Sequence, residues 1–397
     1  MNQPILCPGF QAAGVAAGIK KKAGLLDLGL IYSQVPDTTV AGMFTRNRVM
    51  AAPVVLSKER AAKGSARAII ANAGCANCCT GPQGMAHAKH MTAGAAAGLN
   101  LTDEQVLVAS TGTIGLTLPI DKVQAALPTL IGQLRSDGFE DFSRAIMTTD
   151  TVPKLVQRRG SLDGRPFTAL AVAKGAGMIR PDLATMFCFV CTDVAASPET
   201  LQPMLRASVD RTLNRITIDG DTSTNDTVLI LANGVSGVSV VTAEQQRVFQ
   251  AVLDDLLMDV ARRLVKDGEG VTKVVEIKVQ GAPSDAAALK VAETVAHSPL
   301  VKTAFFGQDA NWGRILGAAG RAGVAIDPER IDVLFDGVQM VKAGQGCGQA
   351  AEDQVTAVMR RPEFTVTIDL HLGAGADSML TCDFSVDYVR INADYRS

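Results

Sequence analysis

The apolar residues of this chain repeat with two different periods, and segments of the two kinds alternate along its length. In one long segment they fall four positions apart, at Val248, Val252, Leu256, Val260 and Leu264. This spacing is the stripe of an amphipathic helix. In residues 364–372, apolar and polar side chains alternate, which indicates a strand with one buried face. We therefore predict a layered α/β fold (α+β layered), in which mixed sheets are sandwiched by helices.

Local signals place further helices. Residues 84–99 are rich in alanine and predict a helix, and residues 119–134 predict another. Ser197 stands before a proline and a glutamate, the pattern of a helix cap with proline at the first position. Thr242 and Gln245 have the spacing of a capping box, so a helix should begin there.

The length and the abundance of small residues constrain this fold further. The chain has 397 residues, which is more than one compact core usually holds, so we expect two domains or lobes. Hydrophobic residues make up 47% and charged residues 20%, the balance of a folded globular protein. Aromatic residues are only 4%, whereas alanine and glycine are frequent. Small side chains allow close backbone approach, which favours tightly packed layers.

Charge and hydropathy exclude several classes of partner. The net charge is −2, so the chain lacks the basic field that holds a nucleic-acid backbone. No apolar stretch approaches the ~20 residues that span a bilayer. The lysines at positions 20–22 follow the weakly apolar N-terminal part, the reverse of a secretory signal. We therefore expect a cytoplasmic protein with no nucleic-acid or membrane partner.

The eight cysteines are expected to be free thiols in a reducing compartment. Cys75 with Cys78 and Cys188 with Cys191 have a spacing that zinc sites use. The second pair lies in a predicted strand, where residues three apart point to opposite faces. We therefore expect no metal site. The chain also carries no dinucleotide fingerprint and no P-loop.

The segment most informative about chemistry is residues 174–187, where glycines and a proline form a loop that leads directly into a predicted strand at Met186–Val190. Thr185 stands at the junction. A threonine there is commonly just the start of a strand. The alternative is a self-processing nucleophile, whose hydroxyl attacks the carbonyl of Ala184 and converts the amide into an ester that water cuts. The new α-amine, with a pKa of about 8, then serves as the base for its own hydroxyl.

An acyl-transfer nucleophile needs hydrogen-bond donors for the developing oxyanion. Val106–Ala109 predicts a short strand, and a turn of small residues, Ser110–Gly115, follows it. The Thr111 hydroxyl and the Gly112 backbone N–H are suitable donors there, although an ordinary strand-to-loop turn explains the same residues.

Taken together, these blocks resemble one family, the ornithine acetyltransferases, also called glutamate N-acetyltransferases, of arginine biosynthesis. The blocks at residues 174–186 and 110–115 match its cleavage and oxyanion motifs. Further blocks follow the family's order, at residues 147–151, 219–227, 267–270, 311–315 and 391–397. The resemblance covers nearly the whole chain. Cys75 and Arg180 depart from the family's usual residues, with an effect on substrate tolerance that the sequence leaves open.

The resemblance implies an ornithine acetyltransferase/DmpA-like fold of the self-cleaving N-terminal-nucleophile type. Residues 1–184 would form an α chain and residues 185–397 a β chain, in a heterotetramer of two α and two β chains. Thr185 would carry acetyl from N-acetyl-ornithine to glutamate through an acetyl-threonine ester, with Thr111 and Gly112 as the oxyanion hole. No cofactor is implied, and acetyl-CoA stays open as a second donor. The implied substrate contacts are Thr148 or Thr149, Lys174, Thr185, Glu269, Asn392 and Ser397.

Two alternatives stay open at this point. An aminopeptidase or amidase of related fold would form the same ester on Thr185 and transfer the acyl group to water. A non-catalytic binding protein would keep the fold as a single uncut chain.

Overall fold

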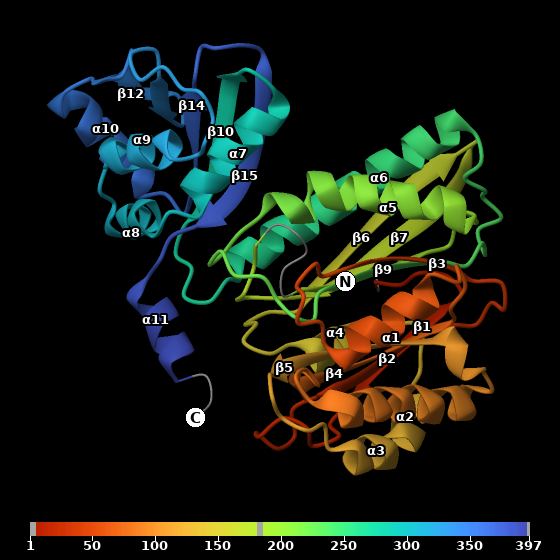
Figure 1. The fold of residues 1–397 in the computed structure, drawn as a ribbon. Coiled ribbons are helices and arrows are strands. Elements are labelled where there is room, and N and C mark those ends of the chain that lie inside the picture. Colours follow the sequence, from red (N-terminus) through yellow and green to blue (C-terminus); the bar gives the residue numbers. More distant parts are fainter. Residues whose placement is uncertain (1–4, 181–185, 395–397) are drawn as a thin grey trace. The chain divides into compact units, whose positions relative to one another are not determined.

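The computed structural model describes residues 5–180 and 186–394, and these form two compact units (Figure 1). The first unit comprises the chain up to residue 214 together with residues 221–264. The second comprises residues 215–220 and the chain from residue 265 onward. This division agrees with the two domains or lobes that the length of the chain predicts. The first unit continues past residue 184, so the proposed cleavage point is not the boundary between the units.

One sheet of the first unit has the strand order β1-β2-β4-β5, made of β1 (Phe10–Val15), β2 (Leu28–Ser33), β4 (Ala68–Cys75) and β5 (Val106–Thr113). β4 and β5 run parallel, with Gly74 opposite Gly112. Because parallel strands end at the same edge of a sheet, Gly74 and Gly112 lie together at that edge.

The second sheet of this unit has the order β3-β9-β8-β7-β6, made of β3 (Thr39–Phe44), β6 (Lys154–Leu162), β7 (Arg165–Lys174), β8 (Phe187–Thr192) and β9 (Thr227–Ala232). β7 and β8 are antiparallel neighbours, with Lys174 opposite Phe187. β8 runs parallel to β9 and is buried along its length. The predicted cleavage point therefore falls, in sequence, between two neighbouring strands of this sheet.

The two sheets pack face to face over a common core. Ile69 and Leu107 from the first sheet share one cluster with Leu170, Phe189 and Leu231 from the second. Helix α4 (Phe139–Ile146) adds two phenylalanines to this core. Such packing of two sheets leaves their outer faces free to be covered by helices.

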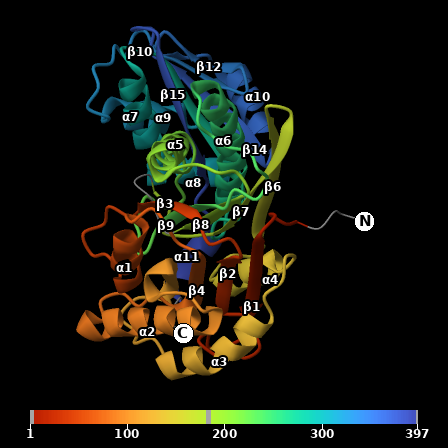
Figure 2. The same cartoon turned by 90° about the vertical axis from the view of Figure 1, so that its right-hand side faces the viewer.

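Helices cover both outer faces of this pair of sheets (Figures 1 and 2). α2 (Gly81–Leu99) and α3 (Ile120–Gly132) pack on the first sheet, where Met91 and Leu127 join the cluster of Leu30 and Ile70. On the second sheet lie α5 (Pro198–Arg211) and α6 (Ala243–Lys266). α1 (Ala52–Ala61) contacts β5 and β3, and short 3-10 turns span Asp103–Gln105 and Leu213–Arg215. The first unit is a helix–sheet–sheet–helix sandwich.

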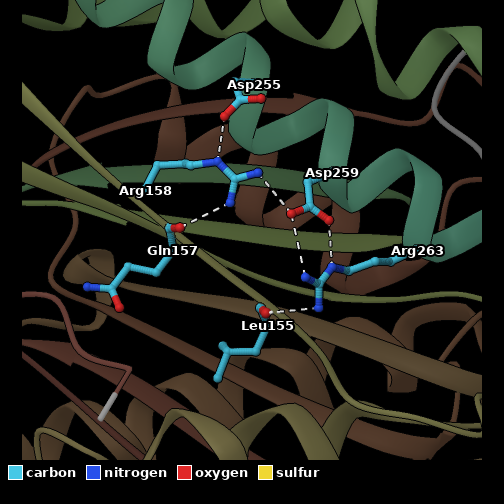
Figure 3. A network of polar contacts seen from close by, with 6 residues as sticks. All are labelled: Leu155, Gln157, Arg158, Asp255, Asp259 and Arg263. Atoms are coloured by element: carbon cyan, nitrogen blue, oxygen red, sulfur yellow. Dashed lines mark hydrogen bonds and ion pairs between the residues drawn. The ribbon is translucent and has the colours of Figure 1, made fainter. Parts of the chain in front are cut away.

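A network of charges fastens α6 to the edge strand β6 (Figure 3). Arg158 on β6 donates from Nε to Asp255 at 2.5 Å and from Nη2 to Asp259 at 2.9 Å. Arg263 donates from Nε to the same Asp259 at 2.6 Å and from Nη1 to the Leu155 carbonyl at 3.4 Å. Asp259 is therefore shared by two guanidinium groups from a helix and a strand.

The second unit is built on a sheet of order β13-β12-β11-β14-β10-β15. Its strands are β10 (Val274–Ala282), β11 (Asp332–Phe335), β12 (Val338–Lys342), β13 (Gln345–Gly346), β14 (Glu363–Asp369) and β15 (Gly375–Cys382). Its helices are α7 (Asp285–Ala296), α8 (Pro299–Gly307), α9 (Trp312–Gly320), α10 (Gln349–Met359) and α11 (Val386–Ala393). Val275 and Ile277 of β10 share its core with Val291 and Val295 of α7.

The local predictions agree with these elements to within a few residues. The cap at Ser197 and the capping box of Thr242 with Gln245 are both present. The strand predicted at Val106–Ala109 continues to Thr113, because pairing with β4 extends it through the small residues. The prediction that a turn begins at Ser110 is therefore wrong, because Ser110 lies within β5.

The cysteine and membrane expectations can be compared with the described part of the chain. Cys191 points into the core between the sheets beside Phe187 and Phe189, and Cys188 has the opposite parity on β8. Among residues 5–180 and 186–394, no three metal-ligating side chains gather in one group. Nor does any helix there have the length and apolar character needed to cross a bilayer.

Candidate active site

The carboxyl ends of β4 and β5 form one side of the site. Gly112 has a φ of +126°, and a Cβ at this position would lie 2.4 Å from the carbonyl carbon of Gly74. Only glycine combines that backbone conformation with so close an approach. Thr111, immediately before it, is buried with 4% exposure. The two predicted oxyanion donors thus stand at a crowded strand end.

Lys174 brings a positive charge to this strand end. It is the last residue of β7 and is 2% exposed. Its Nζ donates to the Thr111 hydroxyl oxygen at 3.3 Å. The structure therefore joins the predicted substrate-binding lysine and the predicted oxyanion threonine, which are 63 residues apart in sequence.

Asp150 is the counter-charge of this buried region. Its Oδ1 accepts hydrogen bonds from Lys154 Nζ at 2.6 Å and the Gly175 N–H at 2.7 Å, and its Oδ2 accepts from the Thr148 N–H at 3.0 Å. Burial raises the pKa of the Asp150 carboxyl, but the charges of Lys174 and Lys154 and these hydrogen bonds lower it more. The net pKa lies well below its usual range, so Asp150 is ionised.

A second buried carboxyl, Asp226, directly precedes β9 and contacts the backbone just before β8. Its Oδ1 accepts a hydrogen bond from the Met186 N–H at 3.0 Å. Met186 is the residue that directly follows Thr185. Burial raises the pKa of Asp226 well above its usual value, and the Met186 N–H and the Lys174 charge oppose this effect. Asp226 therefore fixes the backbone beside the predicted nucleophile and is the more easily protonated of the two carboxyls.

Asn225 ties the loop that carries Asp226 to both strands of the oxyanion edge. Its Nδ2 donates to the Ala76 carbonyl at 2.7 Å and to the Ser110 carbonyl at 2.6 Å. On the other side of the loop, the Thr45 hydroxyl donates to the Ser223 carbonyl at 2.7 Å. The first sheet, the loop and the start of β8 are thus linked by buried hydrogen bonds.

Lys20 is a second lysine beside this cluster. Its Nζ donates to the Leu26 carbonyl at 2.6 Å, and its backbone N–H donates to Asp27 at 2.9 Å. Burial lowers the pKa of Lys20, the charges of Asp27 and Asp150 raise it, and the charge of Lys174 lowers it further. The charges of Lys20, Lys154 and Lys174 are therefore opposed by those of Asp27 and Asp150.

Glu269 and Asn392 meet within the second unit. Asn392 Nδ2, on α11, donates to Glu269 Oε2 at 2.8 Å, and Glu269 is 8% exposed. The neighbouring Gly270 has a φ of +67°, and a Cβ there would lie 2.5 Å from the Tyr388 backbone nitrogen. Close packing of this turn on α11 therefore requires glycine and brings the two predicted substrate-binding residues together.

The other predicted residues are placed as follows. Thr148 and Thr149 are half-buried in the loop between α4 and β6, next to Asp150. Ala184, Thr185 and Ser397 lie outside the described residues. Sequence reasoning assigned no role to the charged and amide residues that hold the site, namely Lys20, Asp150, Lys154, Asn225 and Asp226. Asp150, Asn225 and Asp226 stand in sequence blocks that resemble the family, at residues 147–151 and 219–227. Membership of these blocks was the signal by which the sequence could have indicated a role for them.

Comparison with known proteins identifies the chain more narrowly. The ArgJ family description matches residues 11–397. An arginine biosynthesis bifunctional protein ArgJ from Geobacter sulfurreducens is 48% identical over 391 residues, covering 98% of this chain and 99% of that protein. Its counterpart from Agrobacterium fabrum is 42% identical over 395 residues, covering 98% and 95%.

Among solved structures, the chain is similar to the arginine biosynthesis bifunctional protein ArgJ of Bacillus halodurans. The TM-score is 0.50 at 39% sequence identity, and the match covers 52% of this chain and 97% of that chain.

The layered fold, the buried site and these matches define an acyltransferase of arginine biosynthesis. The chain belongs to the ArgJ family.

Proposed function

We propose that this protein moves the acetyl group of N-acetyl-ornithine to glutamate, after cutting its own backbone between Ala184 and Thr185. The observation that carries the proposal is the contact of Lys174 with Thr111 at 3.3 Å, in the same buried region where Asp226 holds the Met186 N–H. Lys174 and Met186, which flank the segment that contains Thr185, are thus both held by buried hydrogen bonds.

Self-cleavage proceeds in two balanced steps. The Thr185 hydroxyl adds to the Ala184 carbonyl, and the peptide nitrogen leaves as the α-amine of Thr185, which converts the amide into an ester. Water then hydrolyses the ester and leaves a carboxylate on Ala184. The free α-amine has a pKa of about 8, so at neutral pH the unprotonated fraction of it accepts the hydroxyl proton in each later turnover.

Acetyl transfer uses the same hydroxyl twice. Thr185 attacks the acetyl carbonyl of N-acetyl-ornithine, the oxyanion is stabilised by Thr111 and Gly112, and ornithine leaves with the proton. The amine of glutamate then attacks the acetyl-threonine ester, which releases N-acetyl-glutamate and restores Thr185. Buried Lys174 adds positive charge near the oxyanion, because its Nζ contacts the Thr111 oxygen.

The substrates themselves carry charges that the remaining residues match. Both are amino acids with an α-carboxylate, and a buried lysine such as Lys174 suits that group. Glu269, held by Asn392, suits the side-chain ammonium of ornithine. Thr148 or Thr149 and Ser397 would supply further orienting hydrogen bonds.

Two chains per precursor are supported by the length of the Bacillus halodurans polypeptide. Of that chain, 97% matches only 52% of this one, which is the proportion expected where a related precursor is cut near its middle. We propose that residues 1–184 and 185–397 stay together as α and β chains, in a cytoplasmic heterotetramer of two of each. Neither a metal nor a tightly bound cofactor is required, and acetyl-CoA stays open as a second acetyl donor.

The test is an assay of ornithine release from N-acetyl-ornithine with and without glutamate. Transfer predicts release that rises with glutamate concentration and an equal yield of N-acetyl-glutamate. Ornithine release that is indifferent to glutamate would identify an amidase of related fold instead. N-terminal sequencing of the same sample should find a polypeptide that begins with Thr-Met-Phe-Cys.

A further inference from the structure

A cavity in the first unit collects positive charge outside the acyl-transfer site. Its volume is about 450 Å³, and its lining consists of residues 42–48, Met50, Lys58, Arg206 and Asn214. Four of these residues are cations, Arg46, Arg48, Lys58 and Arg206, and none is acidic. The size falls in the range of about 300–1,000 Å³ typical of small-molecule sites.

The cations reach this cavity from three separate segments. Arg46 and Arg48 follow β3, Lys58 lies on α1 and Arg206 lies on α5. The side chains of Arg48, Lys58 and Arg206 are exposed and have no hydrogen bond or ion pair with the residues that the structure describes.

Other arginines of the same two helices are paired. On α1, Arg60 bonds to Asp103 at 2.8 Å, and on α5, Arg211 bonds to Asp254 at 2.7 Å. An acidic group near the cavity, Asp210, accepts a hydrogen bond from Asn214 at 2.9 Å but does not line the cavity. Within residues 5–180 and 186–394, the cations of α1 and α5 that line this cavity, Lys58 and Arg206, thus have no ion-pair partner.

These features select the chemistry of a ligand. Several like charges around a concave surface concentrate the field and attract an anion with more than one charge. Arginine forks match phosphate oxygens in pairs, and lysine adds a point charge. Met43, Phe44 and Met50 contribute apolar surface to the same cavity, which an inorganic ion would not use but an organic group would.

We propose that this cavity binds an organic phosphate of the nucleotide class with at least two phosphate charges, through Arg48, Lys58 and Arg206. This ligand chemistry has two sources: a phosphorylated acyl carrier of the coenzyme A type, or a free nucleotide. The site is distinct from the residues of the proposed acetyl transfer.

The cavity is joined to the acyl-transfer site by one loop. Asn47 Nδ2 donates to the Thr222 carbonyl at 3.3 Å, and the Thr45 hydroxyl donates to the Ser223 carbonyl at 2.7 Å. The same loop continues to Asp226, which holds the Met186 N–H. A ligand in the cavity therefore contacts a wall that is directly hydrogen-bonded to the loop supporting the nucleophile segment.

The experiment is calorimetric titration of the full, processed protein with adenosine diphosphate, inorganic pyrophosphate and coenzyme A. The double variant Arg48→Gln/Arg206→Gln should weaken binding of adenosine diphosphate by about tenfold or more, because two charge-assisted contacts are lost. Arg262→Gln is the matched control: it removes an exposed arginine of α6 that has no hydrogen bond or ion pair among the described residues, and it should leave binding unchanged. Binding should also weaken as salt rises.

The three probes separate the sources. Tighter binding of coenzyme A than of adenosine diphosphate supports the acyl carrier, and equal binding supports a free nucleotide. Undetectable binding of all three to the wild type, or equal binding by wild type and double variant, would overturn the proposal. The double variant should still transfer acetyl from N-acetyl-ornithine to glutamate, which checks its folding; if the wild type itself lacks that transfer, the proposed function fails while the phosphate site is judged on its own.

Discussion

At the scale of single residues, Gly112 links backbone geometry to chemistry. It sits opposite Gly74 at the ends of two parallel strands, with a φ of +126° and no room for a side chain. A larger residue would displace the backbone N–H and the Thr111 hydroxyl, which are the two proposed oxyanion donors. Steric crowding alone therefore constrains this position, and the proposed function would constrain it further.

Gly112→Ala is predicted to destabilise the protein by about 3 kcal/mol and to abolish acetyl transfer, because positive-φ strain adds to a backbone clash. Gly164→Ala is the matched control. Gly164 also has a positive φ, +76°, but nothing lies within 4 Å of its added Cβ, so only strain of about 1–2 kcal/mol is expected. Urea unfolding and the acetyl-transfer assay measure both. Equal losses in the two variants would contradict the steric argument.

Asp150 shows how one carboxylate supports several buried charges. It accepts hydrogen bonds from Lys154 Nζ, the Gly175 N–H and the Thr148 N–H, and the nearby charge of Lys174 lowers its pKa. Removing a partner from a buried pair costs about 3–5 kcal/mol, since the remaining charge stays desolvated.

Asp150→Asn is therefore predicted to lose about 3–5 kcal/mol of stability at neutral pH. The folded pKa lies below the unfolded value of about 3.9, so the stability from Asp150 is present above that value and is lost as pH falls through the folded pKa. The gap between wild type and variant should be widest above about pH 5 and should narrow below about pH 4. Denaturant unfolding across this range tests it, with exposed Asp37→Asn as control. A gap independent of pH would refute the assignment.

At the scale of elements, the start of β8 is positioned by the loop before β9. Asp226 accepts from the Met186 N–H, and the Thr227 N–H donates to the Met186 carbonyl at 3.1 Å. Two hydrogen bonds thus fix the residue next to Thr185 on a buried strand.

Asp226→Ala is predicted to slow self-cleavage by about tenfold or more, because the backbone of Met186, next to the proposed nucleophile, then loses a hydrogen bond that fixes it. Asp226→Asn keeps an oxygen acceptor of the same shape and should cleave nearly as fast as wild type. The fraction of uncut precursor over time, from denaturing gels or intact mass, measures the difference. Cleavage by the alanine variant at the wild-type rate would exclude a positioning role.

The packing of α6 on β6 depends on a polar network at the margin of the sandwich. Asp259 accepts from both Arg158 and Arg263, whereas Asp255 accepts from Arg158 alone and is more exposed (Figure 3). Shared, less exposed charges contribute more than exposed single pairs.

Asp259→Asn is predicted to cost about 1 kcal/mol, and Asp255→Asn less than about 0.5 kcal/mol. Both losses should shrink at high salt, because screening weakens ion pairs near the surface. Urea unfolding at two salt concentrations measures them, and a larger loss for Asp255→Asn would contradict the shared-carboxylate interpretation.

At the scale of the whole molecule, the boundary between the two units and the proposed cleavage point are different features. The first unit includes the chain on both sides of residue 184, and β7 and β8 stay paired across it. A cut there should leave both chains within one core.

Thr185→Ala is therefore predicted to give one folded chain of 41.5 kDa, and wild type to give two chains that separate only on denaturation. Native and denaturing mass spectrometry distinguish these states. A wild type that stays whole and inactive would contradict self-cleavage, and two cut chains that separate under native conditions would contradict the shared core.

Most of the correct predictions of fold class and of helix positions came from short, contiguous stretches of sequence. The layered class and the helices that begin near residues 197 and 242 followed from short stretches, because period and caps are local properties. The end of β5 was misplaced by four residues, from Ala109 to Thr113, because pairing with β4 outweighs a weak local turn preference.

The sequence alone was enough to determine the family and the class of the fold, and it supplied a candidate nucleophile with two candidate oxyanion donors. Only the tertiary structure shows that the charge of Asp150 lies near two buried lysines, and that Asp226 accepts a hydrogen bond from the Met186 N–H. It also shows that cations from three segments line one cavity. Charge partners and burial arise from contacts between distant segments, and those contacts exist only after the sheets have packed.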